Sequence, residues 1–315
     1  MRILLLLALL AATFATRAQD TTVQNLRTDA SRKINRNDAD TVPEGWRAGG
    51  IASVNLSQGS LSNWAAGGDD YSLTVTSLVS LYAFYKKGRN NWDNTLDFNY
   101  GIVNTTSLGS RKNDDRFDVL SKYGYALEPK WNAAVLGNFR TQFFKGYTYT
   151  NEVQTLASDF LSPAYLLLSV GLDFRPAKDL SLYLSPLTGR WTFVNDDTLS
   201  AKGEYGVAPG ENVRSEIGAF FSASYIKAIS KVLGYRGRLD LFSNYQNNPQ
   251  NIDVYMTNLL TVKFTKVLSA TWNVDLIYDD DVRLFGPEKT SPALQLKSLI
   301  GVGLLVKFGN AKKDS

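Results

Sequence analysis

The feature that most constrains this chain is a strict odd-even alternation of apolar and polar residues, which recurs along most of its length. Between residues 92 and 103 the even positions include Trp92 and Phe98, whereas the odd positions include Asp93 and Asp97. A period of two places alternate residues on opposite faces of a β-strand. A packed soluble core does not accept unpaired charges. The pattern therefore predicts strands with one face toward lipid and the other toward a polar lumen, as in a transmembrane β-barrel.

About twelve segments of strand length follow this pattern, an even number of the kind that single-chain bacterial barrels have. They are residues 46–57, 71–85, 92–103, 116–127, 131–144, 164–175, 180–194, 213–227, 231–245, 252–265, 270–278 and 294–308. Short connections alternate with mostly long ones along the chain. This predicts an all-β fold, a closed antiparallel up-and-down barrel with short periplasmic turns, long extracellular loops and both termini in the periplasm.

The N-terminus predicts export. Arg2, an apolar run and small residues before position 19 are typical of a cleaved signal peptide over 1–18. Residues 19–45 are polar without periodicity, which indicates a periplasmic tail or linker. The barrel would occupy 46–308 and a C-terminal tail 309–315. We expect a protein of the outer membrane of a Gram-negative bacterium, whose partners are outer-membrane lipid and, during insertion, the assembly machinery that recognises terminal strands.

Aromatic residues concentrate near the strand ends on the outward parity. The predicted membrane girdle beside the short turns consists of Trp46, Tyr85, Trp92, Trp131, Tyr225, Phe264, Trp272 and Phe308. The general preference of aromatic residues for strands explains their presence but not their position at strand ends. Anchoring of amphipathic rings at the membrane interface explains both.

The inward parity carries charges of both signs. The predicted lumen-lining residues are Asp93, Asp97, Asp118, Lys122, Arg140, Arg214, Glu216, Arg236, Arg238, Asp240 and Asp275. One interpretation is a polar pore with an electrostatic constriction, weakly anion-favouring where the arginines cluster. The other is a set of salt-bridged side chains that keeps the barrel shut. Eight strands leave an interior that side chains fill and sixteen leave a channel, so about twelve strands leave both interpretations open.

The predicted loop from residue 59 to 70 holds Trp64 beside Gly67 and Gly68. A Trp on a compact loop packs the loop against the barrel mouth, folds inward as a constriction, or presents a binding surface. Acidic pairs on other predicted loops have the oxygen ligands that Ca²⁺ and Mg²⁺ prefer. None of them has the spacing of a dedicated calcium loop, so no metal and no cofactor is expected.

Composition excludes several function classes. The chain has no His and no Cys, so Ser-His hydrolysis, Cys-His catalysis and His-ligated zinc are not available to it. Its 34 basic and 30 acidic residues are interspersed, without the basic stripe that nucleic-acid binding requires. Beyond the N-terminal segment no apolar run has the length of a transmembrane helix.

Several short blocks resemble a known family. They are Ser62-Asn63-Trp64-Ala65-Ala66-Gly67-Gly68, Trp92-Asp93-Asn94, Lys112-Asn113-Asp114-Asp115-Arg116, Thr141-Gln142-Phe143 and Ser162-Pro163-Ala164-Tyr165. These blocks resemble a Bacteroidota family known as domain of unknown function 3078, with similarity expected from about Trp46 to the C-terminus. The resemblance implies a barrel of the outer-membrane type, and it implies no activity, ligand or catalytic residue.

The function predicted from the sequence is therefore passive: a narrow channel or small-solute porin with a polar, charged lumen. The alternative is a filled structural barrel, or scaffold, whose loops or periplasmic tail engage a partner. An enzyme at the barrel mouth would have to work without His or Cys.

Overall fold

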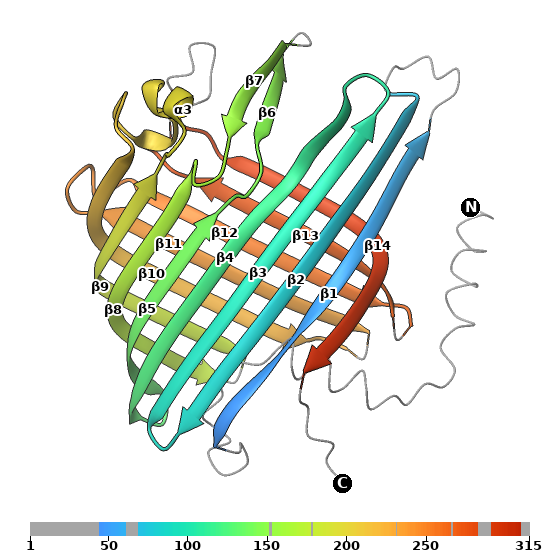
Figure 1. The fold of residues 1–315 in the computed structure, drawn as a ribbon. Coiled ribbons are helices and arrows are strands. Elements are labelled where there is room, and N and C mark those ends of the chain that lie inside the picture. Colours follow the sequence, from blue (N-terminus) through green and yellow to red (C-terminus); the bar gives the residue numbers. More distant parts are fainter. Residues whose placement is uncertain are drawn as a thin grey trace, which may run out of the picture.

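A computed structural model of the chain shows one closed antiparallel barrel of twelve strands (Figure 1). The structure describes residues 44–60, 69–150, 153–177, 179–230, 232–265, 267–282 and 291–309. The predicted signal peptide, nearly all of the predicted periplasmic tail, the loop residues Trp64, Gly67 and Gly68, and the C-terminal tail beyond residue 309 lie outside the described residues.

The first half of the chain contributes six barrel strands: β1 (Gly45–Ser60), β2 (Tyr71–Lys87), β3 (Asn90–Thr105), β4 (Gly109–Glu128), β5 (Trp131–Thr141) and β8 (Ala164–Ala177). The second half contributes β9 (Leu180–Phe193), β10 (Val213–Ala228), β11 (Leu233–Asn244), β12 (Ile252–Lys263), β13 (Leu268–Tyr278) and β14 (Gln295–Gly309). All twelve overlap the predicted strands.

Four further elements lie at the long-loop end, which is at the top of Figure 1. A separate hairpin is formed by β6 (Gly146–Thr150) and β7 (Val153–Ser158), and the connection between β9 and β10 holds α3 (Asp197–Ala201) and the 3₁₀ turn η1 (Glu204–Gly206). None of the described helices is long and apolar enough to cross a membrane.

The barrel closes where its first and last strands meet. β1 pairs with β14 antiparallel, from Gly49 opposite Gly309 to Leu56 opposite Val302. Each remaining strand pairs with two neighbours, in the order β1-β14-β13-β12-β11-β10-β9-β8-β5-β4-β3-β2. A closed ladder leaves no edge strand, so the backbone groups of the wall are satisfied within the wall, as lipid requires.

The outer surface of the barrel is apolar. Large aliphatic side chains of the outward parity are exposed, and Ile300 is 69% exposed. They include Val54, Leu56, Val135, Val170, Leu184, Leu296, Val302, Leu304 and Val306. Monomeric soluble proteins rarely expose an apolar surface of this extent. This surface, together with the closed ladder, agrees with the predicted transmembrane β-barrel.

Two connections differ from the prediction. Residues 104–115 were expected to be a long loop, but β4 begins at Gly109 and only residues 106–108 connect it to β3. This polar stretch keeps the strand ladder because its charges are satisfied by partners such as Lys297, which contacts Asp114. Polarity alone therefore wrongly indicated a loop.

β5 ends at Thr141, three residues before the predicted end. The carboxylate of Asp115 accepts hydrogen bonds from the backbone N–H groups of Phe143 (3.1 Å) and Phe144 (2.8 Å). These bonds take the place of the backbone hydrogen bonds that would continue the strand. The stretch 145–163, expected to be a loop, contains the β6–β7 hairpin.

Candidate solute passage and cavity

Ion pairs cross the interior of the barrel. Arg236 on β11 contacts Asp97 on β3 at 3.4 Å, and these two strands stand opposite each other in the barrel order. Arg116 on β4 contacts Asp275 on β13 at 3.5 Å and donates a hydrogen bond to the Tyr255 hydroxyl on β12 (3.2 Å). Side chains of opposite walls therefore meet within the lumen.

Lys297 extends this bridge. Its ammonium group lies 3.0 Å from Asp114 and 2.9 Å from Asp275. The four side chains Asp114, Lys297, Asp275 and Arg116 thus form a continuous row of ion pairs over β4, β13 and β14. Alternating charges of this kind hold one another in place, because leaving any member unpaired in a partly buried site costs free energy.

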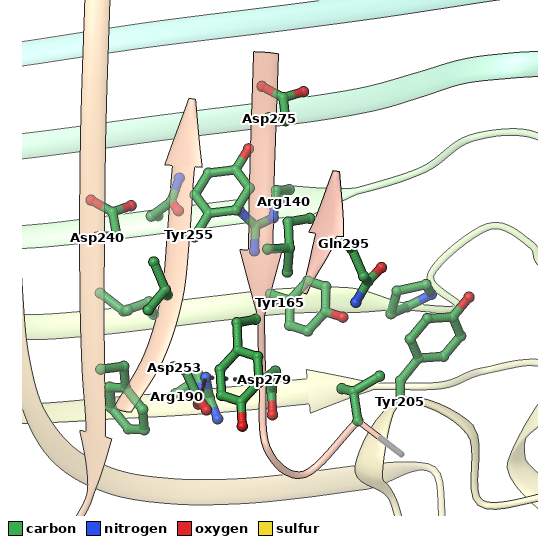
Figure 2. A pocket seen from close by; sticks show the side chains of 18 of the residues that line it. Arg140, Tyr165, Arg190, Tyr205, Asp240, Asp253, Tyr255, Asp275, Asp279 and Gln295 are labelled. Atoms are coloured by element: carbon green, nitrogen blue, oxygen red, sulfur yellow. Dashed lines mark ion pairs between the residues drawn. The ribbon is translucent and has the colours of Figure 1, made fainter. Parts of the chain in front are cut away.

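Three members of this row line a cavity of about 480 Å³. Figure 2 shows part of its lining, with Asp275 of the row labelled. Its wall includes Arg116, Asp275 and Lys297 at the base, and Tyr205 and Val282 of the loops at the mouth. Other lining residues are Asp115, Asn138, Arg140, Tyr165, Leu167, Arg190, Phe220, Asp240, Phe242, Asp253, Tyr255, Ile277, Asp279 and Gln295. The cavity is of a size that holds a small organic molecule.

A second, smaller pocket of about 70 Å³ lies on the wall formed by β12, β13, β14, β1 and β2. Most of its polar lining is small, for example Ser53, Thr74, Thr271 and Gly301. Asp114 lines this pocket, and its ion-pair partner Lys297 lines the large cavity. The Asp114–Lys297 pair therefore stands between the two spaces.

The opposite wall is filled instead. Ala134, Leu136, Tyr183, Phe220 and Phe242 form a buried apolar cluster on β5, β9, β10 and β11. Large side chains thus occupy the lumen beside one wall and small ones line the other. The small-residue wall therefore leaves more room in this part of the lumen than the filled wall does.

Two charge clusters reinforce the barrel ends. Near the long loops, Arg190 makes a bidentate contact with Glu216 (2.7 and 2.8 Å) and a 2.6 Å contact with Asp253. Arg214 contacts Glu216 at 3.0 Å and Asp281 at 3.3 Å. Burial raises the pKa of the Asp281 carboxyl, although the nearby Arg214 opposes the shift.

Near the short turns, Asp173 is fully buried. Its carboxylate contacts Arg175 at 2.5 Å and Lys122 at 3.0 Å, and accepts a hydrogen bond from Ser181 (2.7 Å). Arg175 also lies 3.9 Å from Asp93. This cluster ties β3, β4 and β8 together across the interior.

Loop residues cover the cavity mouth in part. The Tyr205 hydroxyl donates to the Ala157 carbonyl of β7, which links the turn η1 to the hairpin. Below it, Val194, Leu199 and Val207 form a small buried core. Burial raises the pKa of the Tyr205 phenol above its usual range.

All eleven predicted lumen residues lie on the inward parity, but they do not share one site. Arg140, Asp240 and Asp275 line the large cavity. Asp97 and Arg236 pair across the lumen, Arg238 pairs with Asp240 on the same strand (2.6 Å), and Asp118 accepts a hydrogen bond from Asn138 (2.6 Å). Asp93 and Lys122 belong to the short-turn cluster, and Arg214 and Glu216 to the long-loop cluster.

Several interior residues were missing from the predicted set: Asp114, Arg116, Tyr165, Asp173, Arg175, Arg190, Asp253, Tyr255 and Lys297. Most follow the same parity as the predicted residues and were within reach of that rule. Arg190 was not, because the inward parity of β9 changes from odd at Ser185 to even at Thr188, beside a register shift.

The predicted girdle residues lie as follows. Trp46, Trp92, Trp131, Phe264 and Trp272 are exposed. Tyr85 and Tyr225 are half-buried, and the side chain of Phe308 lies outside the described part. The Trp46 ring contacts Tyr85 (5.2 Å) and Trp92 (5.6 Å), so an aromatic cluster stands at the short-turn end. Within the described residues no group of three acidic side chains has the arrangement that holds a metal ion.

Fold and outer surface together define the class of the protein, a transmembrane β-barrel. The family model described as "Protein of unknown function (DUF3078)" matches residues 56–147, which confirms the resemblance over that part of the chain. No curated protein matches the chain significantly.

Solved structures similar to the chain include an outer-membrane channel from Pseudomonas putida F1, with 10% identity and a TM-score of 0.40 over 88% of this chain and 100% of that one. The NanC porin has 10% identity and a TM-score of 0.38 over 81% of this chain and 98% of its own. The translocator domain of the autotransporter NalP from Neisseria meningitidis has 10% identity and a TM-score of 0.37, over 90% and 95%.

Proposed function

We propose that this chain is an outer-membrane barrel that lets small polar solutes pass through a narrow, charge-lined passage. The observation that carries the proposal is two interior spaces, one lined by Lys297 and the other by its ion-pair partner Asp114. Solutes enter the 480 Å³ cavity from the long-loop end, and the 70 Å³ pocket continues along the small-residue wall. The Asp114–Lys297 pair forms the constriction between the two spaces.

The polar, charged interior supports a passage rather than a sealed barrel. A lumen meant only for stability gains little from ion pairs, because well-packed apolar side chains stabilise a buried site as well or better. Selection of solutes by charge at a constriction is a use that such pairs have in channels. In this proposal the protein resides in the outer membrane, reached through the periplasm after removal of the predicted signal peptide.

One observation favours the filled barrel as a second candidate. The apolar cluster around Tyr183, Phe220 and Phe242 occupies part of the lumen. If it and the ion pairs together block every path, the barrel acts as a scaffold for the loops. We also propose that the protein is not an enzyme, which is supported by the lack of any His or Cys for the common nucleophilic and zinc mechanisms.

The test is solute flux into liposomes that contain the folded, heat-modifiable protein. We expect swelling with glycine or arabinose, and faster swelling with the double variant Asp114→Ala, Lys297→Ala, which removes both members of the constriction without leaving Asp114 unpaired. The matched control is Lys145→Ala, whose 3.6 Å ion pair with Asp159 lies at the base of the hairpin and is exposed. Absence of swelling with both the wild type and the double variant would contradict the proposal and favour the scaffold.

A further inference from the structure

Arg140 differs from the other cations that line the large cavity. Arg116, Arg190 and Lys297 each have a carboxylate within 4 Å. Within the described part of the chain, Arg140 has no ion pair and no hydrogen bond. Its register partner on β4, Asp118, is engaged by the Asn138 amide instead (2.6 Å).

Two aromatic rings hold the Arg140 guanidinium in place. Its central carbon lies 3.9 Å from the ring centre of Tyr255 on β12 and 5.1 Å from that of Tyr165 on β8 (Figure 2). Contact of a guanidinium with aromatic rings is favourable and fixes its orientation, while its N–H groups keep their hydrogen-bonding capacity. The cavity thus presents a preoriented cation whose N–H groups no described residue accepts from.

The five aspartates and four cations among the described lining residues give the cavity no excess of positive charge, so any attraction for an anion is local to Arg140. Each of the five aspartates that line the cavity already has a cation within ion-pair distance. Arg140 therefore contributes positive charge that no neighbouring carboxylate compensates at contact distance. Arg140 is half-buried, so an anion that enters the cavity would gain a charge-assisted hydrogen-bonding partner there.

Other residues of the cavity indicate which kind of anion fits beside Arg140, namely a carboxylate attached to an apolar group. The Tyr255 hydroxyl accepts from Arg116 and so retains its own hydrogen for donation to a ligand. The Tyr165 ring also lines the cavity. The lining also includes the apolar side chains of Leu167, Ile277 and Val282, beside the charged residues. The planar guanidinium matches the two oxygens of a carboxylate in a bidentate arrangement.

We propose that Arg140, held between Tyr165 and Tyr255, is a binding site for small organic carboxylates with an aromatic or branched apolar body. This inference deepens the proposed channel function, since it names the class of solute that the cavity selects. It rests on that function only for the route of entry, because binding in the cavity can be measured without transport.

The test is calorimetric titration of the folded, detergent-solubilised protein with benzoate, and with benzyl alcohol as the uncharged analogue. We expect benzoate to bind and benzyl alcohol to bind more weakly. Arg140→Gln should weaken benzoate binding about tenfold to a hundredfold, the effect of losing a charge-assisted hydrogen-bond pair. The control is Lys145→Gln, which removes an exposed cation that does not line the cavity and should leave benzoate binding unchanged.

Heat-modifiable mobility on a gel shows that each variant is folded. If Arg140→Gln does not fold, Arg140→Lys serves instead: it keeps the charge but loses the planar contact, and it should also weaken benzoate binding. Equal binding of benzoate by the wild type and the folded Arg140 variant, equal binding of benzyl alcohol and benzoate, or no benzoate binding overturns the site.

Parallel liposome swelling with arabinose separates this inference from the channel proposal. Arabinose flux without benzoate binding overturns the carboxylate site and leaves the channel. Benzoate binding that depends on Arg140, without arabinose flux, supports the site and contradicts the channel.

Discussion

Arg236 and Asp97 are 139 residues apart in the chain, yet their side chains meet at 3.4 Å across the interior of the barrel. They lie on β11 and β3, which stand opposite each other in the barrel order. The contact shows how closely the two walls approach in this layer. In the proposed passage, a solute would move beside this pair of opposite charges.

Removal of one member of this pair should change ion selectivity. Arg236→Ala leaves the Asp97 carboxylate without its cation, so the lumen becomes more favourable to cations. We expect the reversal potential in a salt gradient to shift toward the cation-selective direction, whereas the exposed-site variant Lys145→Ala leaves it unchanged. An unchanged reversal potential in folded Arg236→Ala would show that ions do not pass this pair.

The Asp173 cluster should carry much of the stability near the short turns. Asp173→Asn removes the charge that compensates Lys122 and Arg175, all three largely buried. Breaking a buried ion pair from one side costs about 3–5 kcal/mol, so we expect a loss of that order in the free energy of unfolding. Urea unfolding in detergent micelles measures it. Lys145→Ala, at an exposed pair, should cost less than about 1 kcal/mol, and an equally small loss for Asp173→Asn would show that the cluster is not structural.

Closure of the barrel depends on a glycine at the seam. Gly303 on β14 faces Asn55 on β1, and a Cβ at this position would stand 2.0 Å from the Val54 carbonyl oxygen. Gly303→Ala should therefore force the two strands apart and reduce the yield of heat-modifiable barrel. Gly234→Ala is the matched control, since a Cβ on that strand glycine meets nothing within 4 Å. Equal yields for the two variants would mean that the seam tolerates the displacement.

The exposed tryptophans should report lipid contact. Trp46, Trp92, Trp131 and Trp272 are on the outer surface, and the indole N–H groups of Trp92 and Trp272 donate to serine hydroxyls at 2.8 and 3.0 Å. Rings of this kind settle at the membrane interface. We expect strong quenching of the intrinsic fluorescence by lipids brominated near the headgroup and weaker quenching by lipids brominated deep in the chain. The reverse order would place these residues away from the interface.

The wall of the barrel could be predicted from the sequence because the strand period is local. The alternation around Trp92 and Phe98 identifies both faces of β3 without any knowledge of its neighbours. The same rule located all twelve strands. Its boundaries were wrong where polarity was mistaken for a loop, as at β4, and where Asp115 ended β5 early.

The interior could be predicted only in part. Parity gives the set of inward residues, but the partner of each depends on the stagger of strands around the closed barrel, which no local pattern encodes. Thus Arg236 and Asp97 were both predicted to line the lumen, whereas their contact was not. For Arg190 the odd-even rule itself gave the wrong face, because β9 changes register between Ser185 and Thr188.

The most direct test of the passage is electrical conductance of the wild-type protein in a planar lipid bilayer. A narrow charge-lined passage predicts small, discrete conductance steps that appear when the heat-modifiable protein is added and are absent with the heat-unfolded protein. A bilayer that contains demonstrably inserted barrel but shows no conductance steps would contradict the passage and leave a filled barrel.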